Sequence, residues 1–124
     1  MSNRSEDQLQ QSIYIWFHNT FPEKRGLLCY NLNNSKNKID GNLNRSKGLQ
    51  AGRSDLVYYR KGRAYMIELK TESGSQEPAQ KKWESLIKSE GFIYVIIRDL
   101  PSFQAFIKKV DDLDNHYQSV LLTI

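Results

Sequence analysis

Apolar side chains recur at the spacing of an α-helix in three parts of the chain. Residues 6–19 follow a capping-box pattern, S-x-x-Q, that starts at Ser5, and Pro22 lies just beyond them, so we expect a helix that ends before this proline. A second helix is expected from Pro78 to a C-terminal stop at Gly91, and a third opens at Pro101. Their inward stripes are Leu9, Ile13, Trp16 and Phe17; Ala79, Trp83, Leu86 and Ile87; and Phe103, Phe106, Ile107 and Val110.

Four shorter runs predict β-strands. Residues 27–32 form an apolar run, and residues 92–97 are apolar without interruption, which indicates burial on both faces. Residues 56–59 and 64–69 are rich in β-branched and aromatic side chains and flank a basic turn with a glycine, which is typical of a β-hairpin. The order is helix, three strands, helix, strand, helix. It predicts an α/β fold with a mixed sheet covered by helices.

Two segments fall outside this pattern. Residues 33–54 are polar, with five asparagines and three glycines and few apolar anchors. So long a connection in a compact domain is usually either functional or disordered. The apolar tail, residues 120–124, fits a last helical turn, a strand or a subunit contact.

The length of 124 residues fits a single domain, residues 1–124, with one core. The composition, 39% hydrophobic and 26% charged, is that of an ordinary globular protein. No apolar run approaches the ~18 residues of a membrane span. The N-terminus lacks the apolar core of a secretory signal, and the single Cys29 excludes an internal disulfide and a cysteine-rich zinc site. We therefore expect a cytoplasmic protein with no membrane contact.

Candidate chemistry is concentrated on the central hairpin. Strand alternation places Glu68 and Lys70 on one face, while Ile67 and Leu69 point to the other, so that one face packs and the other carries charge. Antiparallel pairing across a short turn brings Asp55 beside Glu68. Two carboxylates and a lysine that converge at a sheet edge favour a site for a hard divalent cation and an anionic substrate.

The net charge of +4 is unevenly distributed. Residues 36–63 hold eight basic side chains against two acidic ones, a local balance of +6, so the rest of the chain sums to −2. A basic segment that leads into a carboxylate cluster suits an enzyme that attracts phosphates while it holds a metal. The alternative is a solvated basic loop. The candidate DNA-binding residues are Lys36, Lys38, Arg45, Lys47, Arg53, Lys61 and Arg63.

With Asp55 on the second strand and Glu68-Leu69-Lys70 on the third, the sequence resembles the PD-(D/E)XK nucleases. Residues 48–56, G-L-Q-A-G-R-S-D-L, are similar to the G-L-x-x-G-x-P-D-L signature of the VRR-NUC family, with Ser54 in place of the usual proline.

Other parts of the chain extend this resemblance to about residues 6–110. Gln80 matches a conserved glutamine of the family, and Glu6 with Gln10 is similar to its N-terminal E-x-x-x-Q helix. Asn33 or Asn34 corresponds to the asparagine that ends the first strand. The resemblance implies a restriction-endonuclease-like αβββαβ core and a small stand-alone nuclease of the kind found in phages, acting in a bacterial or phage-infected cell.

The resemblance also implies a role for each site residue. Asp55, Glu68 and the Leu69 carbonyl are the expected ligands of Mg²⁺ or Mn²⁺, and Glu6 is a further ligand, directly or through water. Lys70 is expected to orient the attacking water or to stabilise developing negative charge. Gln80 is expected to hydrogen-bond the lysine, the water or a phosphate. No organic cofactor is expected.

The expected function is a divalent-metal-dependent DNA endonuclease that prefers branched or junction DNA and works as a homodimer. Two rivals are a sequence-specific restriction-type nuclease with the same site and a catalytically inactive DNA-binding module on the same fold.

Four of the site residues also have a structural alternative. Glu68 with Lys70 fits a surface ion pair, Glu6 a first-turn carboxylate favoured by the helix dipole, and Gln80 an exposed helix residue. His18 and His116 have no partner at ligand spacing. The hairpin tyrosines suit sheet packing better than base stacking; they are Tyr58, Tyr59 and Tyr65.

Overall fold

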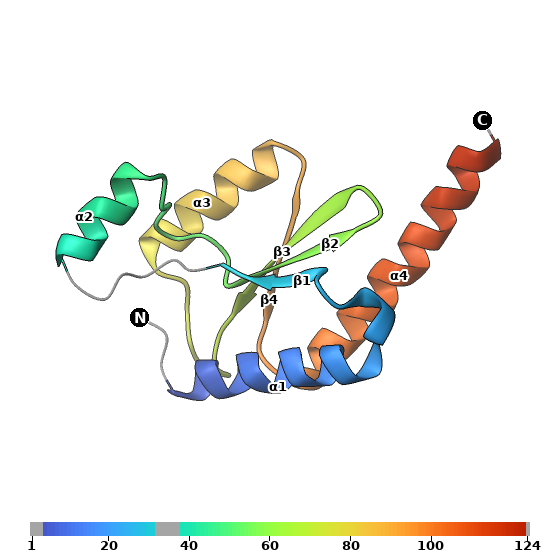
Figure 1. Ribbon diagram of the computed structural model, residues 1–124, viewed down its shortest axis with the longest axis horizontal. Coiled ribbons are helices and arrows are strands. Elements are labelled where there is room, and N and C mark those ends of the chain that lie inside the picture. Colours follow the sequence, from blue (N-terminus) through green and yellow to red (C-terminus); the bar gives the residue numbers. More distant parts are fainter. Residues whose placement is uncertain (1–3, 32–37, 124) are drawn as a thin grey trace.

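The computed structural model describes the backbone of residues 4–31 and 38–123, and the side chains of residues 5–31 and 42–113. A four-stranded sheet lies between two layers of helices: α1 and α4 cover one face and α3 covers the other (Figure 1). The elements in chain order are α1 (Arg4–Thr20), the 3₁₀ helix η1 (Pro22–Lys24), β1 (Leu28–Tyr30), α2 (Lys38–Ser46), β2 (Leu56–Arg60), β3 (Arg63–Leu69), α3 (Pro78–Ser89), β4 (Ile93–Ile97) and α4 (Leu100–Thr123). The expected α/β fold with a mixed sheet is confirmed.

The sheet has the strand order β1-β2-β3-β4, which makes β2 and β3 its central strands. The β1/β2 and β2/β3 pairs are antiparallel and the β3/β4 pair is parallel. A two-residue turn joins β2 to β3, with φ of 48° at Lys61 and 83° at Gly62. Left-handed conformations at both central positions match the twist of a hairpin, and glycine adopts them without strain. The predicted hairpin is therefore confirmed, with a tighter turn than expected.

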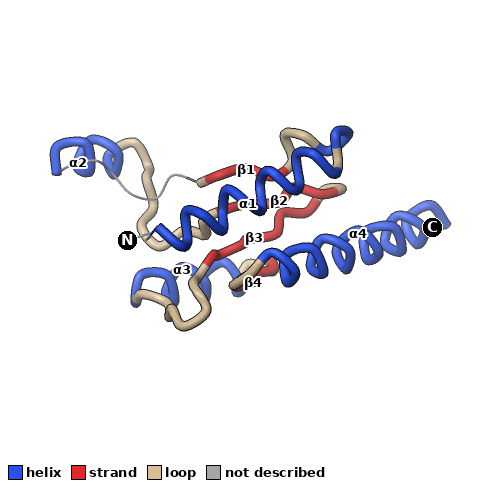
Figure 2. The backbone as a smooth tube through the Cα atoms, turned by 90° about the horizontal axis from the view of Figure 1, so that it is seen from below, coloured by secondary structure: helices blue, strands red, loops and turns tan. Residues whose placement is uncertain are grey.

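The face under α1 and α4 holds the main core. Side chains of the hairpin that point to this face are Tyr58, Tyr65, Ile67 and Leu69, and each is at most 1% exposed. They pack against the predicted stripes of the two helices, which are Ile13, Phe17, Phe103, Ile107 and Val110. Figure 2 shows both helices running across the same side of the strands. The spacing of apolar residues predicted this layer correctly.

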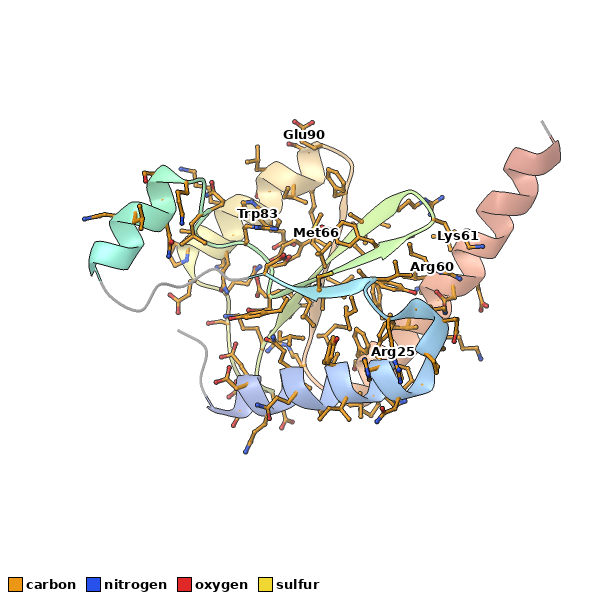
Figure 3. All side chains as sticks on the ribbon, viewed as in Figure 1. Arg25, Arg60, Lys61, Met66, Trp83 and Glu90 are labelled. Atoms are coloured by element: carbon orange, nitrogen blue, oxygen red, sulfur yellow. The ribbon has the colours of Figure 1, made fainter. Side chains whose placement is uncertain are left out.

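The opposite face packs beneath α3. Trp83 of α3 and Tyr94 of β4 are buried, with ring centroids 6.0 Å apart. Met66 of β3 pairs in register with Tyr94, so its side chain lies on this face too; Figure 3 labels Met66 and Trp83. Glu68 and Lys70 share this face and are only 0% and 7% exposed. As predicted, one face packs and the other carries charge, and the charged side chains are buried as well. The surface ion pair is excluded for the same reason.

Several element ends differ from the prediction. Helix α1 begins at Arg4, so Ser5 lies within its first turn instead of capping it. The polar segment 33–54 contains α2, which the low helix propensity of its asparagines and Gly41 concealed. Helix α3 ends as predicted, with Gly91 at φ 91° just beyond its C-cap Glu90.

Strand β4 lies at one edge of the sheet, and both of its faces are covered as predicted, because Tyr94 is buried beneath α3 and Ile97 is buried in the main core. Its first residue, Ile93, is 42% exposed, while Tyr94 and Ile97 are buried. The chain then enters α4, where the Asp99 carboxylate accepts a hydrogen bond from the Ser102 amide (2.8 Å). This helix continues through the apolar tail and extends away from the sheet (Figure 1). None of the described helices is long and apolar enough to cross a membrane.

Candidate active site at the open end of the hairpin

Asp55 lies where β2 begins, next to the end of β3. The register pairs Leu56 with Ile67, so Asp55 falls opposite Glu68 on the α3 face. The Asp55 Oδ2 atom accepts a hydrogen bond from the Leu69 amide (2.7 Å), and its backbone carbonyl accepts one from the Asn31 amide (2.8 Å). These two hydrogen bonds fix Asp55 at the ends of the central strands. The sequence had predicted a site at the edge of the sheet instead.

Glu68 is completely buried, but only one of its oxygens has partners. Its Oε1 accepts hydrogen bonds from the Tyr94 hydroxyl and from the Gln76 side-chain amide (3.2 Å). Its Oε2 is buried and has no hydrogen-bond partner. A buried carboxylate oxygen without a partner is costly, and a bound cation is one way to compensate for it.

Electrostatics show that four predicted groups lie close together. Burial raises the pKa of Asp55 to about 6, against the hydrogen bond from Leu69, which lowers it. The negative charges of Glu68 and Glu6 raise this pKa further, and the positive charge of Lys70 lowers it. The structure thus brings Asp55, Glu68 and Lys70 together where β2 begins and β3 ends. The negative charge of Glu6, from α1, also acts on Asp55.

Lys70 directly follows β3 and its side chain is 7% exposed. Its amide donates to the Ile97 carbonyl (3.1 Å), which continues the pairing with β4 by one residue. The loop 71–77 passes over it: a Cβ added at Gly74 would lie 3.7 Å from the Lys70 Cδ atom. The lysine is therefore held on the site face between the strand and this loop.

Gln80 has a role at the start of α3 that the sequence did not predict. Its side-chain oxygen accepts a hydrogen bond from the Glu77 amide (2.7 Å), as the third residue of a capping box does. This bond uses the Gln80 oxygen to stabilise the helix N-terminus. The expected contact of Gln80 with the lysine, the water or a phosphate stays a prediction, and its side-chain nitrogen would have to make it.

Three further residues shape the loop that carries the glycine-rich motif. Gly52 has φ of 81°, and a Cβ there would lie 2.3 Å from the Ala79 carbonyl oxygen, so only glycine allows the loop to contact α3. Ser54 is 0% exposed, and its hydroxyl donates to the Leu56 carbonyl (3.1 Å). Asn31, just after β1, donates from its side chain to the Ser54 carbonyl (3.2 Å). Asn33 and Asn34 lie outside the described residues.

The basic candidates are divided between two regions. Arg45 and Lys47 are exposed at the end of α2, and Arg53 is half-buried in the loop before Asp55. Lys61 and Arg63 are at the tip of the hairpin, about 20 Å from Asp55 along the strand. Figures 1 and 3 show α2 and Lys61 at opposite ends of the molecule. Lys36 and the side chain of Lys38 lie outside the described residues.

Sequence reasoning missed Gln76 and Tyr94, the two partners of Glu68. Gln76 stands in a loop and Tyr94 in an apolar strand, and neither position carries a local pattern that suggests a site. The only available signal was a polar hydroxyl on a strand predicted to be buried, because a buried tyrosine hydroxyl usually needs a hydrogen-bond partner.

Among the described side chains, no group of three or more His, Cys, Asp or Glu residues is arranged to hold a metal ion. The carboxylates of Asp55 and Glu68 form a pair. Mg²⁺ is usually bound by one or two carboxylates together with waters and substrate phosphates. The residues present therefore fit a Mg²⁺ or Mn²⁺ site that the substrate completes, and they do not fit a cage made by the protein alone.

Comparisons with known proteins agree with this geometry. No family model and no curated protein matches the sequence. One solved structure, described as "VRR_NUC domain protein", is similar with a TM-score of 0.66 and 21% identity over 88% of this chain and 89% of the other. Another, described as "VRR_NUC domain", has a TM-score of 0.53 and 20% identity over 93% and 99% of the two chains. The protein therefore has the fold of the VRR-NUC domain.

Proposed function

We propose that this protein is a divalent-metal-dependent DNA endonuclease of the PD-(D/E)XK type, which hydrolyses phosphodiester bonds. The observation that carries the proposal is the meeting of Asp55, Glu68 and Lys70 at one end of the central hairpin. The similarity to solved VRR-NUC domains supports it. A buried glutamate, a half-buried aspartate and a buried lysine near one another cost folding stability, and such groups are concentrated at functional sites.

The site suits a hard cation for two reasons. The unpartnered Oε2 of Glu68 offers a buried anionic oxygen, and Asp55 lies beside it on the neighbouring strand. Burial, and then the negative charges of Glu68 and Glu6, raise the pKa of Asp55, and a bound cation would favour its ionised form. Asp55 and Glu68 would hold the ion, with the Leu69 carbonyl and Glu6 as further candidate ligands.

When bound, the metal would polarise the scissile phosphate and lower the pKa of an attacking water. The part of Lys70 is electrostatic: the residue is 7% exposed and its positive charge acts on Asp55, so it would stabilise negative charge on the phosphate or orient the water. Glu6 adds negative charge near Asp55 and thereby strengthens the attraction for a cation.

DNA contacts would be made mainly to the phosphate backbone. Arg45, Lys47 and Arg53 lie on the segment that leads into Asp55, so they are the first candidates. Lys61 and Arg63 would be reached only by DNA that continues toward the hairpin tip. We further propose a homodimer that prefers branched DNA, because paired sites suit symmetric cuts.

One cleavage panel tests the proposal. Four-way junction, flap, nicked, linear and single-stranded DNA are incubated with Mg²⁺ or Mn²⁺ and wild-type protein, Glu68→Gln or Lys70→Ala. We expect metal-dependent cutting by the wild type, fastest on a branched substrate. Each variant should lose roughly 10²- to 10⁴-fold in rate, the range typical of acid–base and electrostatic groups. Matched controls are Glu90→Gln and Lys109→Ala, which change exposed residues outside the site.

Other outcomes favour the rivals. A discrete pattern of cuts on linear duplex would indicate a sequence-specific nuclease. DNA binding in EDTA without cutting of any substrate would indicate an inactive binding module. If both site variants cut as fast as the wild type, the assigned site is wrong.

A further inference from the structure

The two oxygens of Glu68 have different surroundings. Oε1 accepts two hydrogen bonds, from Tyr94 and from Gln76, whereas the buried Oε2 accepts none. We propose that Tyr94 and Gln76 are positioning residues: they hold Oε1 and so present Oε2 to the divalent cation. This inference rests on the proposed function and extends it to two residues that do not touch the metal.

Tyr94 provides the rigid part of this arrangement. It lies in β4, where it pairs in register with Met66, and its side chain is 7% exposed. The Trp83 ring packs against its ring, with centroids 6.0 Å apart. Because the strand fixes its backbone and Trp83 packs against its ring, the Tyr94 hydroxyl donates from a defined point, and the Glu68 carboxylate is held against rotation at that oxygen.

Gln76 connects Glu68 to helix α3. Its side-chain nitrogen donates to Glu68 Oε1 (3.2 Å) and to Glu84 Oε1 (2.8 Å), so one amide group bridges two carboxylates. Glu84 is held in turn by an ion pair with Lys88 (2.7 Å). The amide thus donates to both carboxylates without adding a charge of its own.

The loop that carries Gln76 is fastened to the end of β4. The Arg98 guanidinium donates to the carbonyls of Thr71 (2.8 Å) and Gly74 (2.6 Å). Five donors in a planar fork make arginine suited to such a role. Since Lys70 precedes the same loop, the hydrogen bonds from Arg98 help to hold both Lys70 and Gln76 in place around Glu68.

Partners of this kind normally contribute to metal affinity. Loss of a hydrogen bond that orients a ligand typically weakens metal binding 10- to 100-fold. We expect this range for Tyr94→Phe, which removes only the hydroxyl, and for Gln76→Ala. Glu68 would then rotate freely between orientations, of which only some place an oxygen toward the ion.

The test is Mn²⁺ binding without DNA, measured by isothermal titration calorimetry and by the spin resonance of free Mn²⁺. Tyr94→Phe and Gln76→Ala should each raise the dissociation constant at least tenfold. The matched control is Tyr58→Phe, which removes another buried hydroxyl that donates to a carboxylate, that of Asp111 (3.1 Å), on the opposite face. It should leave Mn²⁺ affinity unchanged even if it lowers the melting temperature.

Cleavage at saturating Mn²⁺ separates positioning from direct chemistry. Both variants should recover a cutting rate within a few-fold of the wild type, whereas Glu68→Gln should not. Wild-type affinity in both variants would overturn the inference and leave the proposed nuclease intact. A wild-type protein that neither binds Mn²⁺ nor cuts any DNA in its presence would overturn both. Because Gln76 lies in a loop, its variant remains informative should Tyr94→Phe fail to fold.

Discussion

On the face covered by α1 and α4, the buried side chains of the central strands are aromatic or aliphatic; on the face under α3, the same two strands bury Glu68 and Lys70. The strands and the registers are the same, and only the alternate residues differ. The first face gains the free energy of apolar burial, while the second bears a desolvation cost. A small domain can thus separate stability from chemistry between the two sides of one hairpin.

The largest loss of stability should come from the apolar face. Phe103 is 0% exposed between the sheet and α4, so Phe103→Ala should lower the free energy of unfolding by about 3–5 kcal/mol. Urea denaturation measures this loss. Phe92→Ala, at a side chain that is 42% exposed, is the control and should cost much less. Equal losses in the two variants would contradict the assigned core.

On the charged face, we expect that replacing a site residue raises the free energy of unfolding instead of lowering it. Because the folded protein raises the pKa of Asp55 from 3.8 to about 6, the folded state binds the proton more tightly than the unfolded chain. The contribution of Asp55 to stability therefore falls as pH rises through this window. In metal-free protein, Asp55→Asn should be more stable than the wild type by about 1–3 kcal/mol above pH 6.

The measurement is urea denaturation of both proteins in EDTA from pH 4 to pH 8. The difference between the two should be small near pH 4 and should grow toward pH 7. Saturating Mg²⁺ should raise the melting temperature of the wild type and not that of Asp55→Asn. A difference that stays constant over the whole pH range would show that the folded protein does not raise the pKa of Asp55.

The smallest effect concerns the approach of DNA to the charged face. Arg45→Ala combined with Lys47→Ala should reduce the slope of log affinity against log salt by roughly 2, because each phosphate contact contributes about 0.9. Folding stability should stay within about 0.5 kcal/mol of the wild type, since both side chains are exposed. Lys61→Ala, at the far hairpin tip, should change the slope less. An unchanged slope in the double variant would remove α2 from the interface.

The sequence correctly predicted the structural features that depend on a local pattern of residues. The hairpin followed from two β-rich runs around Gly62, and the meeting of Asp55 with Glu68 followed from strand alternation. The apolar stripes correctly placed α1 and α4 on the main core. In each case neighbours in sequence or in register carry the information.

The remaining features depend on contacts between distant segments. The burial of Glu68 and Lys70 depends on such segments: Tyr94 and Gln76 contact Glu68, and the loop 71–77 lies over Lys70, which strand alternation alone does not reveal. Gln80 was assigned from the motif, whereas its oxygen caps a helix. Gln76, eight residues after Glu68, reaches it only because the loop folds back across the strand.

The close approach at Gly52 also limits how this protein can be redesigned. The loop before Asp55 is an obvious place to vary when a different substrate is wanted, yet at this one position a single methyl group would collide with the backbone of α3. A library that randomises the neighbouring positions and keeps the glycine would explore new specificities without pushing the loop off the helix.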